Sequence, residues 1–131
     1  MQPAGTPALT VNRSGQSLTK MPQDILAMTF VQQLDLSNNH LTGALPAEIR
    51  HLSNLQVLNI SSNKMTSLPA ELGQLSKLRI LNASNNQFTG IPHELGNLQN
   101  LEVLDLSGND ISEFDLQEIR KKLPASTQII L

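Results

Sequence analysis

Side chains with catalytic potential recur in this sequence at fixed positions of a repeated motif, and their spacing limits what they can do. Asp35 and Asp105 occupy the same position in the first and fourth copies of that motif. A glycosidase needs two carboxyl groups about 5 to 9.5 Å apart. If each copy supplies one strand of a parallel sheet, three spacings of about 4.8 Å would separate the two acids by about 14 Å. They are therefore not expected to act as a catalytic pair.

Serine recurs two residues after the acidic position, as Ser37, Ser61, Ser84 and Ser107. A serine nucleophile needs a base within hydrogen-bond reach, and the only histidine expected on the same face is His40, three positions after Ser37. His51 and His93 fall in the second halves of their repeats, so the pattern gives no metal-ligand cluster. Cysteine is absent, which removes disulfides, thiolate metal sites and a cysteine nucleophile. We therefore expect neither an enzyme nor a cofactor.

The amino-acid composition limits the class of protein and the kind of partner that this chain can have. The 131 residues fit one domain, and the core must be aliphatic because Trp and Tyr are absent and Phe occurs three times. A formal charge of −2, with scattered charged residues, offers no basic stripe for nucleic acid. The sequence shows neither a signal peptide nor a run of about 18 apolar residues, so membrane insertion is not expected. A cytoplasmic location is expected, with secretion left open if a leader has been removed.

The elements that position these side chains come from a repeat of 23 or 24 residues that starts at Leu34, Leu58, Leu81 and Leu104. From each leucine, an apolar residue follows at +2, Asn at +5 and another apolar residue at +7. This period is typical of a solenoid. The alternation predicts a short strand with one face inward, paired with its neighbours in a parallel sheet. The asparagines (Asn39, Asn63, Asn86, Asn109) are expected to satisfy backbone groups where the chain leaves the sheet.

The second half of each repeat also follows a pattern. Pro22, Pro46, Pro69 and Pro92 each precede an acid by two residues. Proline near the first helical position, with an acid in the first turn, favours a short helix. We therefore expect one or two helical or 3₁₀ turns on the outer, convex face, where the acids stabilise helix starts and do not form a binding stripe.

The ends of the repeat region depart from the pattern. Residues 1–10 are interpreted as an N-terminal tail and 11–131 as a single domain. Within that domain, residues 11–30 form a degenerate capping repeat, in which Val11 takes the leucine position and Arg13 replaces an apolar residue. Repeats cover 31–111. Residues 112–131 are expected to form a capping helix and a last short strand, because Leu116, Ile119 and Leu123 have helical spacing before Pro124.

The motif L-x-x-L-x-L-x-x-N-x-L closely resembles the leucine-rich repeat family over roughly residues 11–131. LPAEIRHLSNL and LPAELGQLSKL look like intracellular or bacterial members, whereas LTGALP and FTGIP are similar to plant receptor ectodomains. The resemblance implies an α/β solenoid with a curved parallel sheet on the concave face and short helical or 3₁₀ turns on the convex face. It also implies non-enzymatic recognition of a protein partner through the concave face, by a chain that we expect to be monomeric. Two alternatives stay open: a substrate-recruiting or regulatory segment of a larger signalling enzyme (a kinase or ubiquitin ligase), and a scaffold without an evolved ligand.

Outward-pointing strand residues are the candidate binding residues that the resemblance implies. They are Gln33, Asp35, Val57, Asn59, Ile80, Asn82, Val103 and Asp105, joined by His40, Lys64 and Gln87 and by the serine row given above. Val57, Ile80 and Val103 form the best apolar stripe, although valine and isoleucine also simply favour strands. Asn12, Asn59 and Asn82 stand in Asn-x-Ser triplets that match the glycosylation pattern. We interpret the triplets as a by-product of the repeat; glycans there would crowd the concave face.

Overall fold

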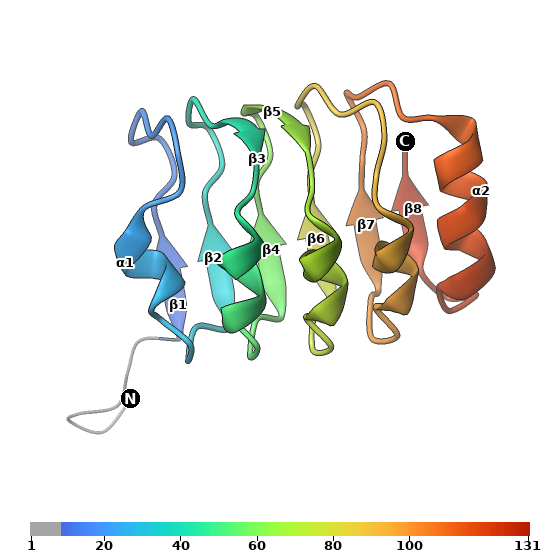
Figure 1. The fold of residues 1–131 in the computed structure, drawn as a ribbon, viewed down its shortest axis with the longest axis horizontal. Helices are drawn as coiled ribbons and strands as arrows, with labels where there is room; N and C mark the ends of the chain where they lie inside the picture. The colour runs from blue at the N-terminus through green and yellow to red at the C-terminus, as the bar shows by residue number, and fades with distance from the viewer. Residues whose placement is uncertain (1–8) are drawn as a thin grey trace.

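A computed structural model describes residues 9–131 as a stack of similar coils with a parallel sheet along one side (Figure 1). The six-stranded sheet is formed, in spatial order, by β1 (Thr10–Asn12), β2 (Gln33–Asp35), β4 (Val57–Asn59), β6 (Ile80–Asn82), β7 (Val103–Asp105) and β8 (Gln128–Ile130). Every adjacent pair is parallel. The predicted α/β leucine-rich solenoid is confirmed.

Strand register follows the leucine column. Leu34 is aligned with Leu58, Leu58 with Leu81, and Leu81 with Leu104. The central residue of each of these strands is buried while its two neighbours are at least partly exposed, as expected for a strand with one face inward. Val11 pairs with Leu34 at one end of the sheet, which confirms the leucine-equivalent position assigned to it.

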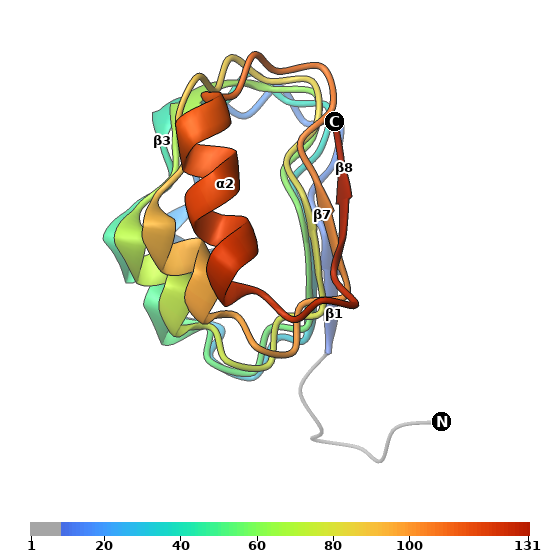
Figure 2. The same cartoon turned by 90° about the vertical axis from the view of Figure 1, so that its right-hand side faces the viewer.

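The opposite wall of the solenoid consists of short helices: α1 (Gln23–Leu26), η1 (Ala47–His51), η2 (Ala70–Gln74), η3 (His93–Asn97) and the longer α2 (Glu113–Lys122). Figure 2 shows this wall facing the sheet across the interior. The expected proline occupies the residue just before each of the first four helices, in extended conformation, and an acid lies in the first turn. Of these five elements, η1, η2 and η3 are 3₁₀ helices, as the sequence pattern allowed.

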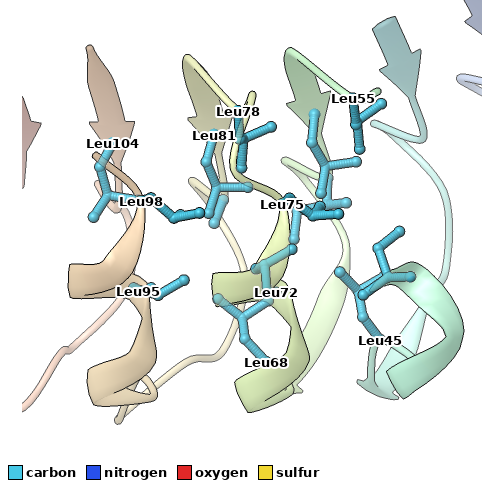
Figure 3. Packing of buried hydrophobic residues seen from close by; sticks show 14 of the residues in the cluster. Leu45, Leu55, Leu68, Leu72, Leu75, Leu78, Leu81, Leu95, Leu98 and Leu104 are labelled. Atoms are coloured by element: carbon cyan, nitrogen blue, oxygen red, sulfur yellow. The ribbon is translucent and has the colours of Figure 1, made fainter. Parts of the chain in front are cut away.

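Aliphatic side chains from both walls fill the interior. Figure 3 shows leucines of successive coils packed between the strands and the convex turns, among them Leu72, Leu81 and Leu95, which are fully buried. One coil presents its apolar edge to the next, so the core is continuous along the stack. Phe88 is the largest of the fully buried side chains.

A second, two-stranded sheet of β3 (Thr42–Ala44) and β5 (Lys64–Ser67) lies where the chain leaves the main sheet. This small sheet was not expected from the sequence. Gly43, at the centre of β3, has a φ of +67°, a conformation that glycine adopts without steric cost. The residues of β3 are all exposed, so they carry no apolar alternation from which a strand could be predicted.

The repeated asparagines form a ladder through the turn, as predicted. The Asn63 side-chain amide donates to the carbonyls of Leu36, Ile60 and Ser61, at 3.0 to 3.1 Å. Its Oδ1 accepts from the backbone N–H of Leu41 at 3.1 Å. Asn86 and Asn109 repeat this arrangement one and two coils later. Each asparagine therefore joins its own turn to the preceding coil.

The two ends of the stack are closed differently. At the N-terminal end, Arg13 donates to Asp24 of α1 at 2.7 Å, so a cation that replaces an apolar residue spans from the first strand to the convex wall. At the C-terminal end, α2 begins after Ser112, whose hydroxyl accepts from the Asp115 N–H. The predicted capping helix and last strand are both present. None of the helices within residues 9–131 is long and apolar enough to cross a membrane.

Candidate binding surface on the concave face

Two rows of side chains run across the six strands on the face opposite the core. The Val57 row contains Thr10, Gln33, Val57, Ile80, Val103 and Gln128; the Asn59 row contains Asn12, Asp35, Asn59, Asn82, Asp105 and Ile130. All of these residues are exposed or half-buried, whereas the leucine column between the two rows is buried from Leu34 to Leu104. Most of the candidate residues therefore share this face.

A turn that follows β1, β2, β4, β6 and β7 fixes the Asp and Asn side chains of the Asn59 row. Oδ1 of Asp35 accepts from both the N–H and the hydroxyl of Ser37, at 2.9 and 2.6 Å. The same pair of hydrogen bonds joins Asn59 to Ser61 and recurs in the coils of Asn12, Asn82 and Asp105. Because only Oδ1 is used, Asp and Asn serve equally in this turn. The turn also explains why Asn-x-Ser triplets recur in this chain, with no need to invoke glycosylation.

The serines do not form the outward-facing row that was expected. Ser37 and Ser84 are only 5% and 6% exposed, and the hydroxyls of all four repeat serines donate to the preceding Asp or Asn side chain. The expectation failed because the strands end at the Asn59 row, so the alternation of faces stops before the serine. These hydroxyls hold the turn and are not free on the face.

The next residue of each turn bends the chain away from the sheet. Asn38, Ser62 and Asn85 have φ values of 56° or 57°, and Gly108 has a φ of +73°. This left-handed conformation is tolerated by Asn and Gly and is strained for Ser. The chain consequently turns toward the convex side directly after the Asn59 row and its serine.

His40, Lys64 and Gln87 lie beyond this turn. All three are exposed, and Lys64 is the first residue of β5 in the two-stranded sheet. They are therefore rim residues, placed past the carboxyl ends of the main strands, and they are not part of the two rows. They were expected on the strand face, but the alternation of the strand does not continue through the turn.

Residues of the capping strands belong to the surface as well. Asn12 and Thr10 of β1 extend the two rows, and Gln128 and Ile130 of β8 end them. From the sequence, Asn12 was interpreted only as part of a glycosylation pattern. The signal was present, because Asn12 and Ser14 have the same spacing as Asp35 and Ser37.

The face is shallow, mostly polar and almost uncharged. A hollow of about 200 Å³ lies between β1, β2 and β4, lined by Thr10, Asn12, Gln33, Leu34, Asp35, Val57 and Asn59. Asp35 and Asp105 are the only charged residues of the two rows. Next to the Val57 row, Arg79 donates to Glu102, and this hydrogen bond lowers the pKa of the Glu102 carboxyl. Within residues 9–131, His, Asp and Glu side chains nowhere gather in a group of three that could hold a metal ion.

Comparisons with known proteins agree with this geometry. Residues 34–123 match the family described as a leucine-rich repeat region. A leucine-rich repeat protein of Leptospira interrogans is 41% identical, with a TM-score of 0.79 over 86% of this chain and 28% of its own. The ectodomain of the Arabidopsis thaliana receptor kinase SOBIR1 is 30% identical, with a TM-score of 0.71 over 92% and 66%.

A plant peptide hormone receptor, RGFR1, in complex with RGF2, is 31% identical, with a TM-score of 0.73 over 92% of this chain and 21% of its own. The chain thus spans between about a fifth and two thirds of these three proteins. Both bacterial and plant proteins are among them, as the mixed repeat motifs indicated. No curated protein matches the chain.

Proposed function

From the premise that the chain belongs to the leucine-rich repeat family, we propose that it binds a segment of a protein partner on the concave face of its six-stranded sheet. The observation that carries this proposal is the pair of outward-facing rows that cross the six strands, one of which has its Asp and Asn side chains fixed by a turn at the strand end. The family and its structural neighbours are typically non-enzymatic binding modules. RGFR1, one such neighbour, is a peptide hormone receptor.

Rigidity supports binding at this face. Oδ1 of each Asp and Asn in the Asn59 row is held at 2.6 to 2.7 Å by a serine hydroxyl, so these five side chains lose little rotational freedom when a partner binds. The strands themselves are anchored by the buried leucine column. The free protein therefore already presents the surface in its bound form, and binding does not have to order it.

The composition of the face indicates an interface of modest strength. The two rows lack Trp, Tyr and Arg, the residues that most often dominate binding energy. Val57, Ile80 and Val103 are half-buried and supply a short apolar stripe. The partner is therefore held by many small contacts, with the rim residues His40, Lys64 and Gln87 touching its flanks. The binding unit is a monomer.

One observation favours the alternative that this chain is the recognition part of a larger protein. It resembles the ectodomain of a receptor kinase over 92% of its length. In that case the same concave face performs the recognition, and a linked domain supplies a separate activity.

Site-specific photo-crosslinking tests the proposal. A photo-reactive amino acid replaces Gln33 on β2 in one variant and Gln74 on η2 in a matched control; both positions are exposed glutamines, on opposite walls. We expect a defined adduct with a protein from the native host at position 33 and none at position 74. Adding Ile80→Arg to the first variant should abolish the adduct, because a long cation then stands on the face. Adducts that form only at position 74, or that persist with Ile80→Arg, contradict the proposal.

A further inference from the structure

The distribution of charge on the concave face narrows the chemistry of its partner. Asp35 and Asp105 stand in one row, and both are half-buried. Within residues 9–131 neither forms an ion pair. One oxygen of each carboxylate accepts a hydrogen bond from the turn serine. Within residues 9–131, the second oxygen accepts no hydrogen bond from the protein. Each acid therefore offers a partly desolvated acceptor to a cation.

The strand register fixes the distance between these two acceptors. Asp35 is aligned with Asn59, Asn59 with Asn82, and Asn82 with Asp105. Three strand spacings of about 4.8 Å separate the acids by about 14 Å. An extended chain advances about 3.3 Å per residue and points every second side chain the same way, so residues i and i+4 lie about 13 Å apart on one face.

A helical partner fits this distance less well. Side chains of an α-helix return to the same face after seven or eleven residues, which corresponds to about 10.5 or 16.5 Å at 1.5 Å per residue. Neither length matches the separation of the two acids. The extended conformation is therefore the one whose own repeat coincides with the sheet.

The residues between the two acids determine which side chain the partner should carry at i+2. Asn59 and Asn82 lie between the two acids, and their strand neighbours in the Val57 row are Val57 and Ile80. A side chain at i+2 of an extended segment would lie over this part of the face. Asn59 and Asn82 are uncharged and already hold their turns, and the aliphatic side chains of the neighbouring row lie beside them, so an apolar residue at i+2 gains from contact with Val57 and Ile80.

We propose that the concave face binds an extended protein segment with a basic residue at i, an apolar residue at i+2 and a basic residue at i+4. The segment crosses the strands from β2 to β7, and its cations pair with Asp35 and Asp105. This inference rests on the proposed function and adds the chemistry of the partner. The hollow between β1, β2 and β4 leaves room beside Asp35 for a long basic side chain.

The repeats themselves provide substitutions that remove charge without disturbing the turn. Asn12, Asn59 and Asn82 make the same two hydrogen bonds to serine that Asp35 and Asp105 make. The variants Asp35→Asn and Asp105→Asn should therefore keep the fold and lose one acceptor charge each. Asp110→Asn is the matched control, because Asp110 is an exposed acid outside the two rows.

Two synthetic heptapeptides of identical composition serve as probes: SKSLSKS, with lysines four apart around a leucine, and SKLSKSS, with lysines three apart. Both are titrated into isotope-labelled protein and followed by amide NMR shifts, with thermal unfolding to verify each variant's fold. We expect SKSLSKS to shift amides of β2, β4, β6 and β7 and to bind several-fold more tightly than SKLSKSS. Asp35→Asn and Asp105→Asn should each weaken it about two- to fivefold, whereas Asp110→Asn should not.

The outcomes separate this inference from the proposed function. If SKSLSKS shifts the concave amides but neither Asp→Asn substitution weakens it, or if SKLSKSS binds equally well, the charge pattern is refuted and the proposed binding face stands. If SKSLSKS shifts no amide of the sheet, the inference is likewise refuted, and the crosslinking experiment alone then decides the proposed function.

Discussion

Replacing Asn63 by alanine should destabilise the protein by about 2.5 to 4.5 kcal/mol, and the structure shows where this free energy comes from. Asn63 is 7% exposed and makes one hydrogen bond to the N–H of Leu41 and three to carbonyl groups. The side-chain oxygen is the partner that the structure gives to the Leu41 N–H. Alanine leaves this buried donor without a partner, which costs about 1 to 3 kcal/mol.

The three carbonyl groups contribute less, because each keeps a second donor. The Leu36 carbonyl is also bonded by Asn39, the Ile60 carbonyl by Asn86, and the Ser61 carbonyl by the backbone N–H of Asn38. Losing one of two donors removes a favourable contact without creating an unsatisfied group. We assign about 0.5 kcal/mol to each of the three, the low end of the range for a net hydrogen bond.

Urea unfolding followed by circular dichroism measures the change, with an unchanged m-value as the condition for comparison. Asn100→Ala is the control, because this exposed asparagine makes one comparable hydrogen bond, to the Ser76 carbonyl; its removal should cost less than about 1 kcal/mol. Asn63→Asp provides a second check, since a carboxylate would face three carbonyl oxygens. Asn63→Asp should be more destabilising than Asn63→Ala at neutral pH, and it should regain stability in acid, where the carboxylate is protonated. A loss below about 1 kcal/mol for Asn63→Ala, together with a neutral Asn63→Asp, would refute the proposed role of the ladder.

Three further changes test the assignment of faces, turns and caps. Leu81→Ala should lower the free energy of unfolding by about 2 to 5 kcal/mol because Leu81 is fully buried. Asn82→Asp should change it by less than about 0.5 kcal/mol, because the turn uses only Oδ1. Similar losses for the two variants in urea unfolding would contradict the assignment of Leu81 to the core and Asn82 to the surface. Ser62→Gly should stabilise the protein by about 0.5 to 1 kcal/mol, because Ser62 has a φ of 57°, and an unchanged or lower melting temperature would speak against strain at this turn. The hydrogen bond from His93 lowers the pKa of Asp115 from its ordinary value of 3.8. The interaction therefore stabilises the fold above pH 3.8, and this stability is lost as the pH falls below that value. Asp115→Asn should lose less stability between about pH 6 and pH 3 than the unchanged chain, and equal losses would contradict a stabilising His93–Asp115 interaction.

The leucine column made most of the fold predictable. Leu34, Leu58, Leu81 and Leu104 recur with a constant offset, and burial of each one fixes both the face of its strand and the register with the next. The convex turns could be predicted for a similar reason, because proline and an acid favour the start of a helix whatever packs against it. These features depend on local patterns that every coil repeats.

Features that depend on where a strand ends were harder to predict. The alternation of faces holds from Gln33 to Asp35, and the turn then directs Ser37 inward. The alternation of apolar and polar residues does not indicate where a strand ends. The serines and Lys64 were therefore expected on the strand face, although they lie in or beyond the turn. The β3–β5 sheet was missed because its strands differ in sequence between repeats and β3 is wholly exposed.

The turn that follows β1, β2, β4, β6 and β7 has an evolutionary consequence. Because this turn accepts Asp or Asn through the same oxygen, and because the codons of these two amino acids differ by one base, a single mutation can change the formal charge of one strand while the turn is kept. The five coils can thus gain or lose acidity independently of one another. The net charge of the concave face is therefore free to change during evolution, while the selection that maintains folding acts on other residues.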